Sequence, residues 1–154
     1  MTGYGNYAGF AGHGDFGPCI VWNDAVSNFA SPSYYMQKTL FSDNQGTRLL
    51  PFTQTTANCF WSVSEDTASG KHDVLLKVAN KSGASESVNI TLKGVEKVDP
   101  AGHAITLTGA PEDENSLANP TKVVPSTGTF AAGASFKYRF PAYSVAVLRI
   151  GFSK

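Results

Sequence analysis

The chain has 154 residues, of which 42% are hydrophobic and 16% are charged. This composition is typical of one globular domain, which at this size buries roughly 68 to 70% of its unfolded surface. Twelve Lys and Arg residues balance twelve Asp and Glu residues, so the sequence lacks the basic surplus that nucleic acids or anionic membranes select. It also lacks the ~20 consecutive apolar residues of a membrane span and the pattern of a signal peptide. We therefore expect no nucleic-acid partner and no membrane partner.

The N-terminal part begins with backbone that follows no regular period. Residues 1–17, MTGYGNYAGFAGHGDFG, show no spacing of 2 or 3.6, which indicates an irregular segment. Residues 18–22, PCIVW, form a short apolar run after a proline and predict one buried strand. We expect a loop over residues 23–33.

Ser31 and Pro32 mark the start of the one helix that the sequence predicts. Ser31 suits the N-cap position, and Pro32 fits the first helical position. Four side chains then fall on one helical face, those of Tyr35, Met36, Thr39 and Leu40. We expect the helix to end near residues 44–46, with Gly46 as a left-handed cap.

From Thr47 onward the pattern changes to alternation and turns. Seven runs rich in Val, Ile, Thr, Phe and Tyr predict strands over residues 47–52, 58–65, 72–80, 87–95, 104–109, 135–140 and 144–151. Gly, Ser and Pro mark connections at residues 66–71, 81–86, 98–103 and 129–134. The predicted fold is mainly β, an antiparallel β-sandwich or jelly roll preceded by an irregular segment and one α-helix. We divide it into residues 1–45 and a β-domain over residues 46–154.

The run at residues 72–80 shows one apolar position more than a half-buried strand needs. Val74, Leu76 and Val78 share one face, and Leu75 lies on the other face beside charged residues. We expect Leu75 to be covered by something outside this chain.

Two features depend on the compartment of the protein. Cys19 and Cys59 can make at most one disulfide, and their apolar neighbours favour buried free thiols. Asn80 and Asn89 each begin an N-glycosylation sequon, which matters only in a secretory pathway. The low charge, the abundance of Ser, Thr, Gly and Asn, and the 12% of aromatic residues favour an extracellular or a sugar-handling protein.

The acidic run EDENSLANPTKVVP at residues 112–125 has three interpretations. A calcium site needs alternating carboxylates and a glycine, which the run lacks. A catalytic pair of Glu112 and Glu114 would alternate sides, without the apolar burial that raises the pKa of an acid. We favour a solvated crossover between strands, stiffened by Pro111, Pro120 and Pro125.

Other candidate sites are weak. His13, His72 and His103 lie far apart and show no metal-ligand spacing, so we interpret each as a surface or hydrogen-bonded histidine. The glycine-rich start lacks a phosphate-loop pattern, and no nucleophile elbow occurs. We therefore predict no catalytic residue, no cofactor site and no metal site in this chain.

Six aromatic residues could stack sugar rings if they formed an exposed row. They are Trp22, Tyr34, Tyr35, Trp61, Tyr138 and Tyr143. Five of the six sit in apolar periodic runs, which favours core packing over sugar binding.

Three stretches together resemble α-L-arabinofuranosidases of glycoside hydrolase family 51. The stretches are FGPCIVWNDAVSNFASPSYYMQKTLFSDNQGTRLLP, LTGAPEDENSLANPTKVVP and FPAYSVAVLRI, in the order in which that family has them. The sequence departs from the family at Cys19, where Asp is common, and residues 1–14 match only loosely. The resemblance implies that the chain is the end of a barrel plus the C-terminal β-sandwich, with Ser33 to Phe41 in the last barrel helix.

The resemblance also implies a function for the parent enzyme. Members of the family remove terminal α-L-arabinofuranosyl groups from arabinoxylan or arabinan with retention, through two glutamates on a (β/α)8 barrel. Such a barrel needs about 250 residues, and both glutamates lie upstream of the matched stretches. No residue here matches their motifs, so we expect this chain alone to be non-catalytic.

The resemblance further implies a partner and a role for the acidic run. The partner is the catalytic barrel, in the same or a separate chain, with plant cell-wall polysaccharide as a further candidate. The family's sandwich also borrows strands from the N-terminal end of the enzyme. Asp113, Glu114, Asn115 and Ser116 would bond to backbone at a tight connection. The alternatives are a free-standing carbohydrate-binding module and an interaction module.

Overall fold

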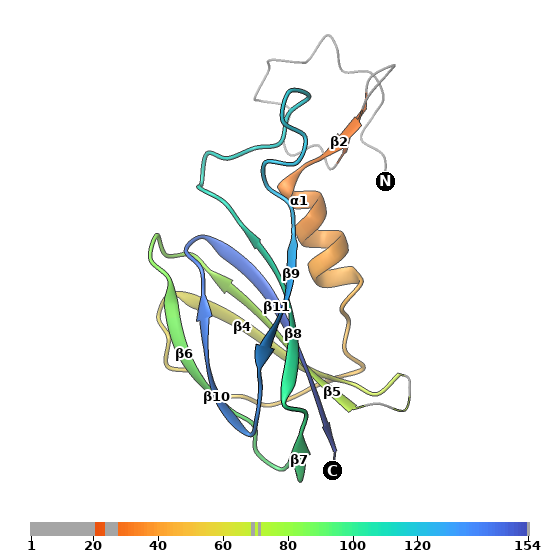
Figure 1. The fold of residues 1–154 in the computed structure, drawn as a ribbon, viewed down its shortest axis with the longest axis vertical. Helices are drawn as coiled ribbons and strands as arrows, with labels where there is room; N and C mark the ends of the chain where they lie inside the picture. Colours follow the sequence, from red (N-terminus) through yellow and green to blue (C-terminus); the bar gives the residue numbers. More distant parts are fainter. Residues whose placement is uncertain (1–20, 24–27, 69, 71, 154) are drawn as a thin grey trace.

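A computed structural model describes residues 21–23, 28–68, 70 and 72–153, and in them a sandwich of two antiparallel sheets with a helix on its outer face (Figure 1). The main sheet has the order β3-β4-β5-β11-β8-β9, and β7 pairs with the end of β11. Its strands are β3 (Arg48–Leu49), β4 (Cys59–Asp66), β5 (His72–Asn80), β7 (Lys97–Val98), β8 (Ala101–Thr108), β9 (Ser126–Ala131) and β11 (Ser144–Ser153). The small sheet pairs β6 (Glu86–Thr91) with β10 (Ser135–Phe140). The predicted mainly β sandwich is confirmed.

Strand β11 is a central strand of the main sheet. It pairs with β5 along one side and with β8 along the other. Its side chains alternate between two apolar layers: Ala146, Leu148 and Ile150 face the small sheet, and Val147 faces the helix. Because both faces are covered there, residues 145–148 are apolar on both faces rather than alternating with polar residues.

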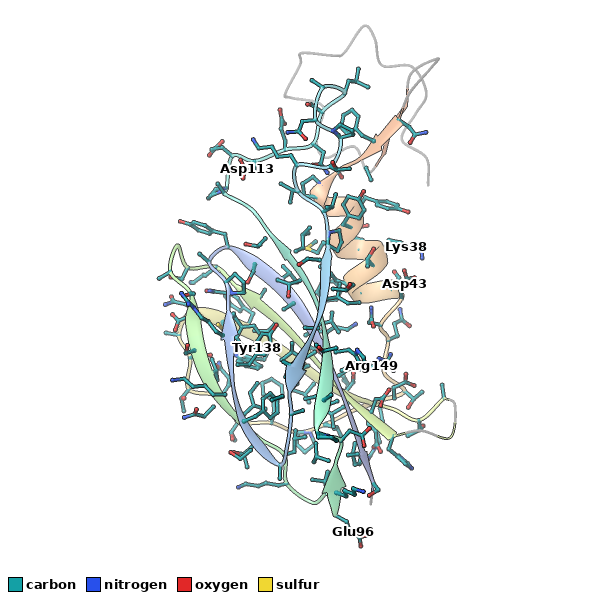
Figure 2. The ribbon with its side chains drawn as sticks, viewed as in Figure 1. Lys38, Asp43, Glu96, Asp113, Tyr138 and Arg149 are labelled. Atoms are coloured by element: carbon teal, nitrogen blue, oxygen red, sulfur yellow. The ribbon has the colours of Figure 1, made fainter. Side chains whose placement is uncertain are left out.

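The core between the two sheets is the larger one. Its buried members are Cys59, Val63, Val74, Leu76, Val78, Ile90, Ala104, Phe140, Ala146, Leu148 and Ile150. Aromatic rings fill its width: Trp61 meets Phe140 edge-on with centroids 5.4 Å apart, and Tyr138 lies 4.9 Å from Phe140. Figure 2 shows Tyr138 on the small sheet, beside the main sheet. These contacts are typical of favourable aromatic packing.

The core on the opposite face of the main sheet explains Leu75. It consists of Leu40, Leu75, Leu107, Val123 and Val147, with Tyr35 and Met36 packed against it. Leu75 is 0% exposed. The expectation that something outside the chain covers Leu75 is therefore wrong, because the chain's own helix covers it.

The predicted helix begins where expected but ends differently. Ser31 caps α1 (Pro32–Tyr35) by accepting the Tyr34 N–H at 3.2 Å. The helix then widens into the π-helical segment η1 (Met36–Ser42), closed by the bond from the Asp43 N–H to the Lys38 carbonyl. In the described part of the chain, no helix is long and apolar enough to cross a membrane.

The expected left-handed glycine cap at Gly46 is wrong. The Asn44 side-chain amide instead donates to the Thr39 carbonyl at 2.7 Å, and the positive-φ glycines among the described residues are Gly70 and Gly94. A Cβ at Gly46 would collide with Ser64 and the Glu65 carbonyl. Glycine therefore permits a close approach to β4 there.

The predicted strand at residues 18–22 is found in part, and three further strands, β2, β7 and β9, lie outside the predicted strands. The predicted strand at residues 18–22 overlaps β1 (Val21–Asn23), and residues 18–20 lie outside the described part. Its partner β2 (Asn28–Ala30) falls in a predicted loop. β7 overlaps the predicted connection at residues 98–103, and β9 overlaps the one at residues 129–134. Each gains backbone hydrogen bonds from a neighbour that local sequence does not reveal. The division at residues 45 and 46 stays a prediction.

We expect Leu40→Ala to destabilise the protein by about 2 to 5 kcal/mol, because it leaves a cavity between the helix and the main sheet. Urea unfolding followed by circular dichroism measures the change. The control is Leu49→Ala, whose side chain is 78% exposed and which we expect to stay within about 0.5 kcal/mol of wild type. Equal effects of the two changes would contradict the packing of the helix on the sheet.

Candidate functional site

The acidic run lies in a long loop between two strands that are direct neighbours. Residues 109–125 join β8 to β9. The last residue pair between the two strands before the loop is Thr106 with Ser126. β8 and β9 therefore form a hairpin with a long loop. The prediction of a crossover is wrong, because the loop joins two adjacent strands. Figure 1 shows it extending to the end of the molecule where β2 lies.

The acidic side chains of this loop bind the loop itself. The Asp113 carboxylate pairs with Lys122 at 2.9 Å and accepts the Ala110 N–H at 2.9 Å. The Lys122 hydrogen bond and then the Ala110 N–H lower the pKa of Asp113. Glu112 and Glu114 are exposed. A lowered pKa keeps Asp113 ionised, which is the opposite of what a general acid needs.

Asn115 ties the loop to the strand that precedes the helix. Its side chain is 5% exposed, and its amide donates to the carbonyls of Ala30 at 2.8 Å and Val123 at 2.9 Å. Its Oδ1 accepts the Val123 N–H at 2.7 Å. Nearby, Ser116 Oγ accepts the Asn119 N–H at 3.1 Å. The implied backbone bonding is confirmed for Asp113, Asn115 and Ser116.

A second group of carboxylates surrounds Arg149 on β11. Its Nη1 lies 3.0 Å from Asp66 and 2.6 Å from Asp73. Figure 2 places Arg149 far from Asp113, so the two acidic groups are separate. Sequence reasoning missed this cluster, because the three residues lie on three different strands and only the register brings them together.

The two aspartates are close together, yet they are unsuited to cleave a glycoside. Such cleavage needs one carboxyl group that stays protonated, with a raised pKa, and a second that is ionised. The Ala68 N–H and then Arg149 lower the pKa of Asp66. Both carboxylates also direct an oxygen at the same guanidinium. We interpret the cluster as a clamp that holds β4, β5 and β11 together.

A further carboxylate of interest is that of buried Glu65. Its side chain is 1% exposed and binds the guanidinium of Arg48 and, at 3.0 Å, Nδ1 of His72. His72 thus has a hydrogen-bonding partner, His103 is exposed on β8, and His13 lies outside the described residues. Within the described ranges, no group of three His, Cys, Asp or Glu side chains could hold a metal ion.

Cys59 and the aromatic residues largely follow the core prediction. Cys59 is a buried free thiol, and Cys19 lies outside the described residues. Trp61 and Tyr138 pack against the larger core, and Tyr35 packs against the helix-side core. Tyr143 is exposed at a turn with φ of 44°.

A groove of about 400 Å³ opens between the two sheets. Residues 50–56 and β6 form its sides, and Val63, Val74 and Leu76 of the main sheet contribute to its lining. Trp61 lines it and donates its indole N–H to Thr56 Oγ1 at 2.9 Å. Glu65 is the one carboxylate among its described lining residues. The groove therefore lacks the two carboxyl groups that glycoside hydrolysis uses, but its lining can hold an apolar segment or a ligand.

These features define a β-sandwich domain in which Glu65, Asp66 and Asp73 are held in ion pairs. A family model described as the α-L-arabinofuranosidase C-terminal domain matches residues 4–144. Because the match covers most of the sequence, the chain belongs to this family. A search of the curated proteins finds no match.

Solved structures of α-L-arabinofuranosidases share the fold. The arabinose-bound MgGH51 α-L-arabinofuranosidase is 33% identical, with a TM-score of 0.82 over 90% of this chain. Enzymes from Thermotoga petrophila RKU-1 and Thermotoga maritima are each 18% identical, with TM-scores of 0.71 over 85% and 0.72 over 86% of this chain. The chain spans 22% of the first enzyme and 31% of each of the other two. It therefore corresponds to the C-terminal domain of much longer enzymes.

We expect Asn115→Ala to lower the free energy of unfolding by about 1 to 3 kcal/mol, because it leaves buried backbone groups of Val123 unpaired. Urea titration measures the loss. Asn119→Ala is the matched control in the same loop, where the side chain is exposed and the change should stay within about 0.5 kcal/mol. A similar loss in both variants would contradict the role of Asn115.

Proposed function

We propose that the chain is the supporting sandwich of an α-L-arabinofuranosidase whose catalytic barrel is carried by the rest of the enzyme. The observation that carries this proposal is the family match over residues 4–144, together with the small share of MgGH51 that the chain spans. The parent enzyme would hydrolyse terminal α-L-arabinofuranosyl groups of arabinoxylan or arabinan with retention. Retention requires two carboxyl groups ~5 to 5.5 Å apart, and those groups would lie on the barrel.

The unequal sizes of the two sheets support a contact with the rest of the enzyme. Among the described strands, β6 pairs only with β10, so its other edge faces the groove side of the sandwich. An unpaired edge beside an apolar groove is a natural place for an added strand. We propose that a strand from the N-terminal end of the enzyme docks there, as the family resemblance implies.

The location and the wider partner are also proposals. An enzyme that trims arabinoxylan or arabinan must reach polymers outside the cell, so we propose an extracellular location with plant cell-wall polysaccharide as substrate. The low charge and the polar, hydroxyl-rich composition are compatible with this location.

We expect residues 1–154, purified alone, to release no nitrophenol from nitrophenyl α-L-arabinofuranoside, because the proposed catalytic carboxylates lie on the barrel. Absorbance measures the release over a buffer blank. The matched control is the variant Asp66→Asn, which removes one carboxylate of the Arg149 cluster. Turnover that survives repurification and disappears in the variant would overturn the proposal and assign catalysis to this cluster.

The groove favours a second candidate, a carbohydrate-binding module. Trp61 and exposed Phe52 line it beside amide and hydroxyl groups of Gln54 and Thr53, a combination that suits sugar rings.

Isothermal titration of the chain with arabinoxylan and arabino-oligosaccharides separates the two functions. A supporting domain gives no saturable heat, which is the outcome we expect, because Trp61 packs against Phe140 and bonds to Thr56. Saturable heat that Phe52→Ala removes would favour the binding module instead.

A further inference from the structure

The chain carries two N-glycosylation sequons, and their asparagines differ in exposure to solvent. They are Asn80-Lys81-Ser82 at the end of β5 and Asn89-Ile90-Thr91 in β6. A third Asn-x-Thr, at Asn119, has proline in the middle position, which excludes it. We propose that Asn89 is an N-glycosylation site of this protein and that Asn80 is a structural residue that carries no glycan.

Asn80 has no room for a sugar and no free hydrogen to exchange for one. Its side chain is 2% exposed. Nδ2 donates both its hydrogens, to the carbonyls of Ala84 at 2.9 Å and Pro141 at 2.7 Å. Oδ1 accepts the Ser82 N–H at 3.0 Å. A glycan on Nδ2 would remove one of these buried bonds and force a bulky polar group into the turn after β5, which is incompatible with the structure of this turn.

Asn89 has the opposite environment. Strand alternation turns Val88 and Ile90 toward the core between the sheets and leaves Asn89 exposed on the outer face of the small sheet. Its pairing partner across the sheet is Lys137, which is also exposed. A glycan here leaves the sandwich core untouched.

The neighbours of Asn89 complete a polar outer face. Its other exposed members are Ser87, Thr91, Ser135, Lys137 and Arg139. Thr91 Oγ1 and Ser135 Oγ share a hydrogen bond of 3.2 Å. Sugars can therefore lie over polar groups, and no large apolar side chain on this face requires a protein partner.

The modification is a group transfer from a lipid-linked oligosaccharide diphosphate. A bond forms between Nδ2 of Asn89 and C1 of the first sugar, while the bond between C1 and the phosphate oxygen breaks. The lipid diphosphate leaves with the bonding electron pair, and Nδ2 gives up one proton to a base of the transferase. No redox partner is needed.

The inference rests on the proposed extracellular location for its natural occurrence, but not on the proposed activity.

The test secretes the full chain, with a cleavable leader, from a yeast host that supplies the pathway, so it is independent of hydrolysis by any parent enzyme. We expect one glycan per chain, seen as a mass shift that peptide N-glycosidase removes, with conversion of Asn89 to Asp in the peptide map. Thr91→Ala should abolish the shift, whereas Thr91→Ser should keep it. Ser82→Ala removes the other sequon without replacing Asn80, and it should leave the mass shift unchanged.

Three outcomes would overturn the proposal. One is a glycan on Asn80 in soluble protein with the far-ultraviolet circular dichroism of the unmodified fold. Another is a mass shift that persists in Thr91→Ala. The last is an unmodified wild-type chain while a reference sequon protein, secreted from the same cells, is glycosylated.

Discussion

The burial of β11 on both faces is the constraint on which the rest of the structure depends. Residues 146–148 of β11 are all buried, and a strand segment that is buried on both faces needs an apolar layer above and below it. The small sheet supplies one layer through Phe140 and Ile90, and the helix supplies the other through Leu40. The three layers therefore stabilise one another.

This constraint changes how the helix is understood. The resemblance assigns it to the end of a barrel, yet within this chain it closes the second core over Leu75 and Val147. Asn115 then fastens the acidic loop to β2 just before the helix, and Lys77 of β5 donates to the Phe41 carbonyl at 3.1 Å near its end. These contacts fix the helix in position on the main sheet.

The sequence allowed the strands and the helix start to be predicted because both depend on local pattern. Alternation identified β5 and β11, and Ser31 with Pro32 identified the cap. The pattern also showed that Leu75 needs a cover, but a period of two cannot say which segment supplies it. Strand β9, the Asn44 cap and the Arg149 clamp escaped prediction, since each depends on which distant residues become neighbours. The acidic run was predicted to be a solvated connection, whereas the burial of Asn115 had no local signal.

The charges of this domain are arranged to hold backbone and strands in place, and that arrangement conflicts with acid catalysis. Lys122 and the Ala110 N–H lower the pKa of Asp113, and the Ala68 N–H and Arg149 lower that of Asp66. A donor that strengthens a structural contact with a carboxylate also stabilises its ionised form, so the same residue cannot stay protonated near neutral pH. In the proposed parent enzyme, dividing the two tasks between this sandwich and a barrel would remove the conflict, because the barrel's acid could then sit in a site without such donors.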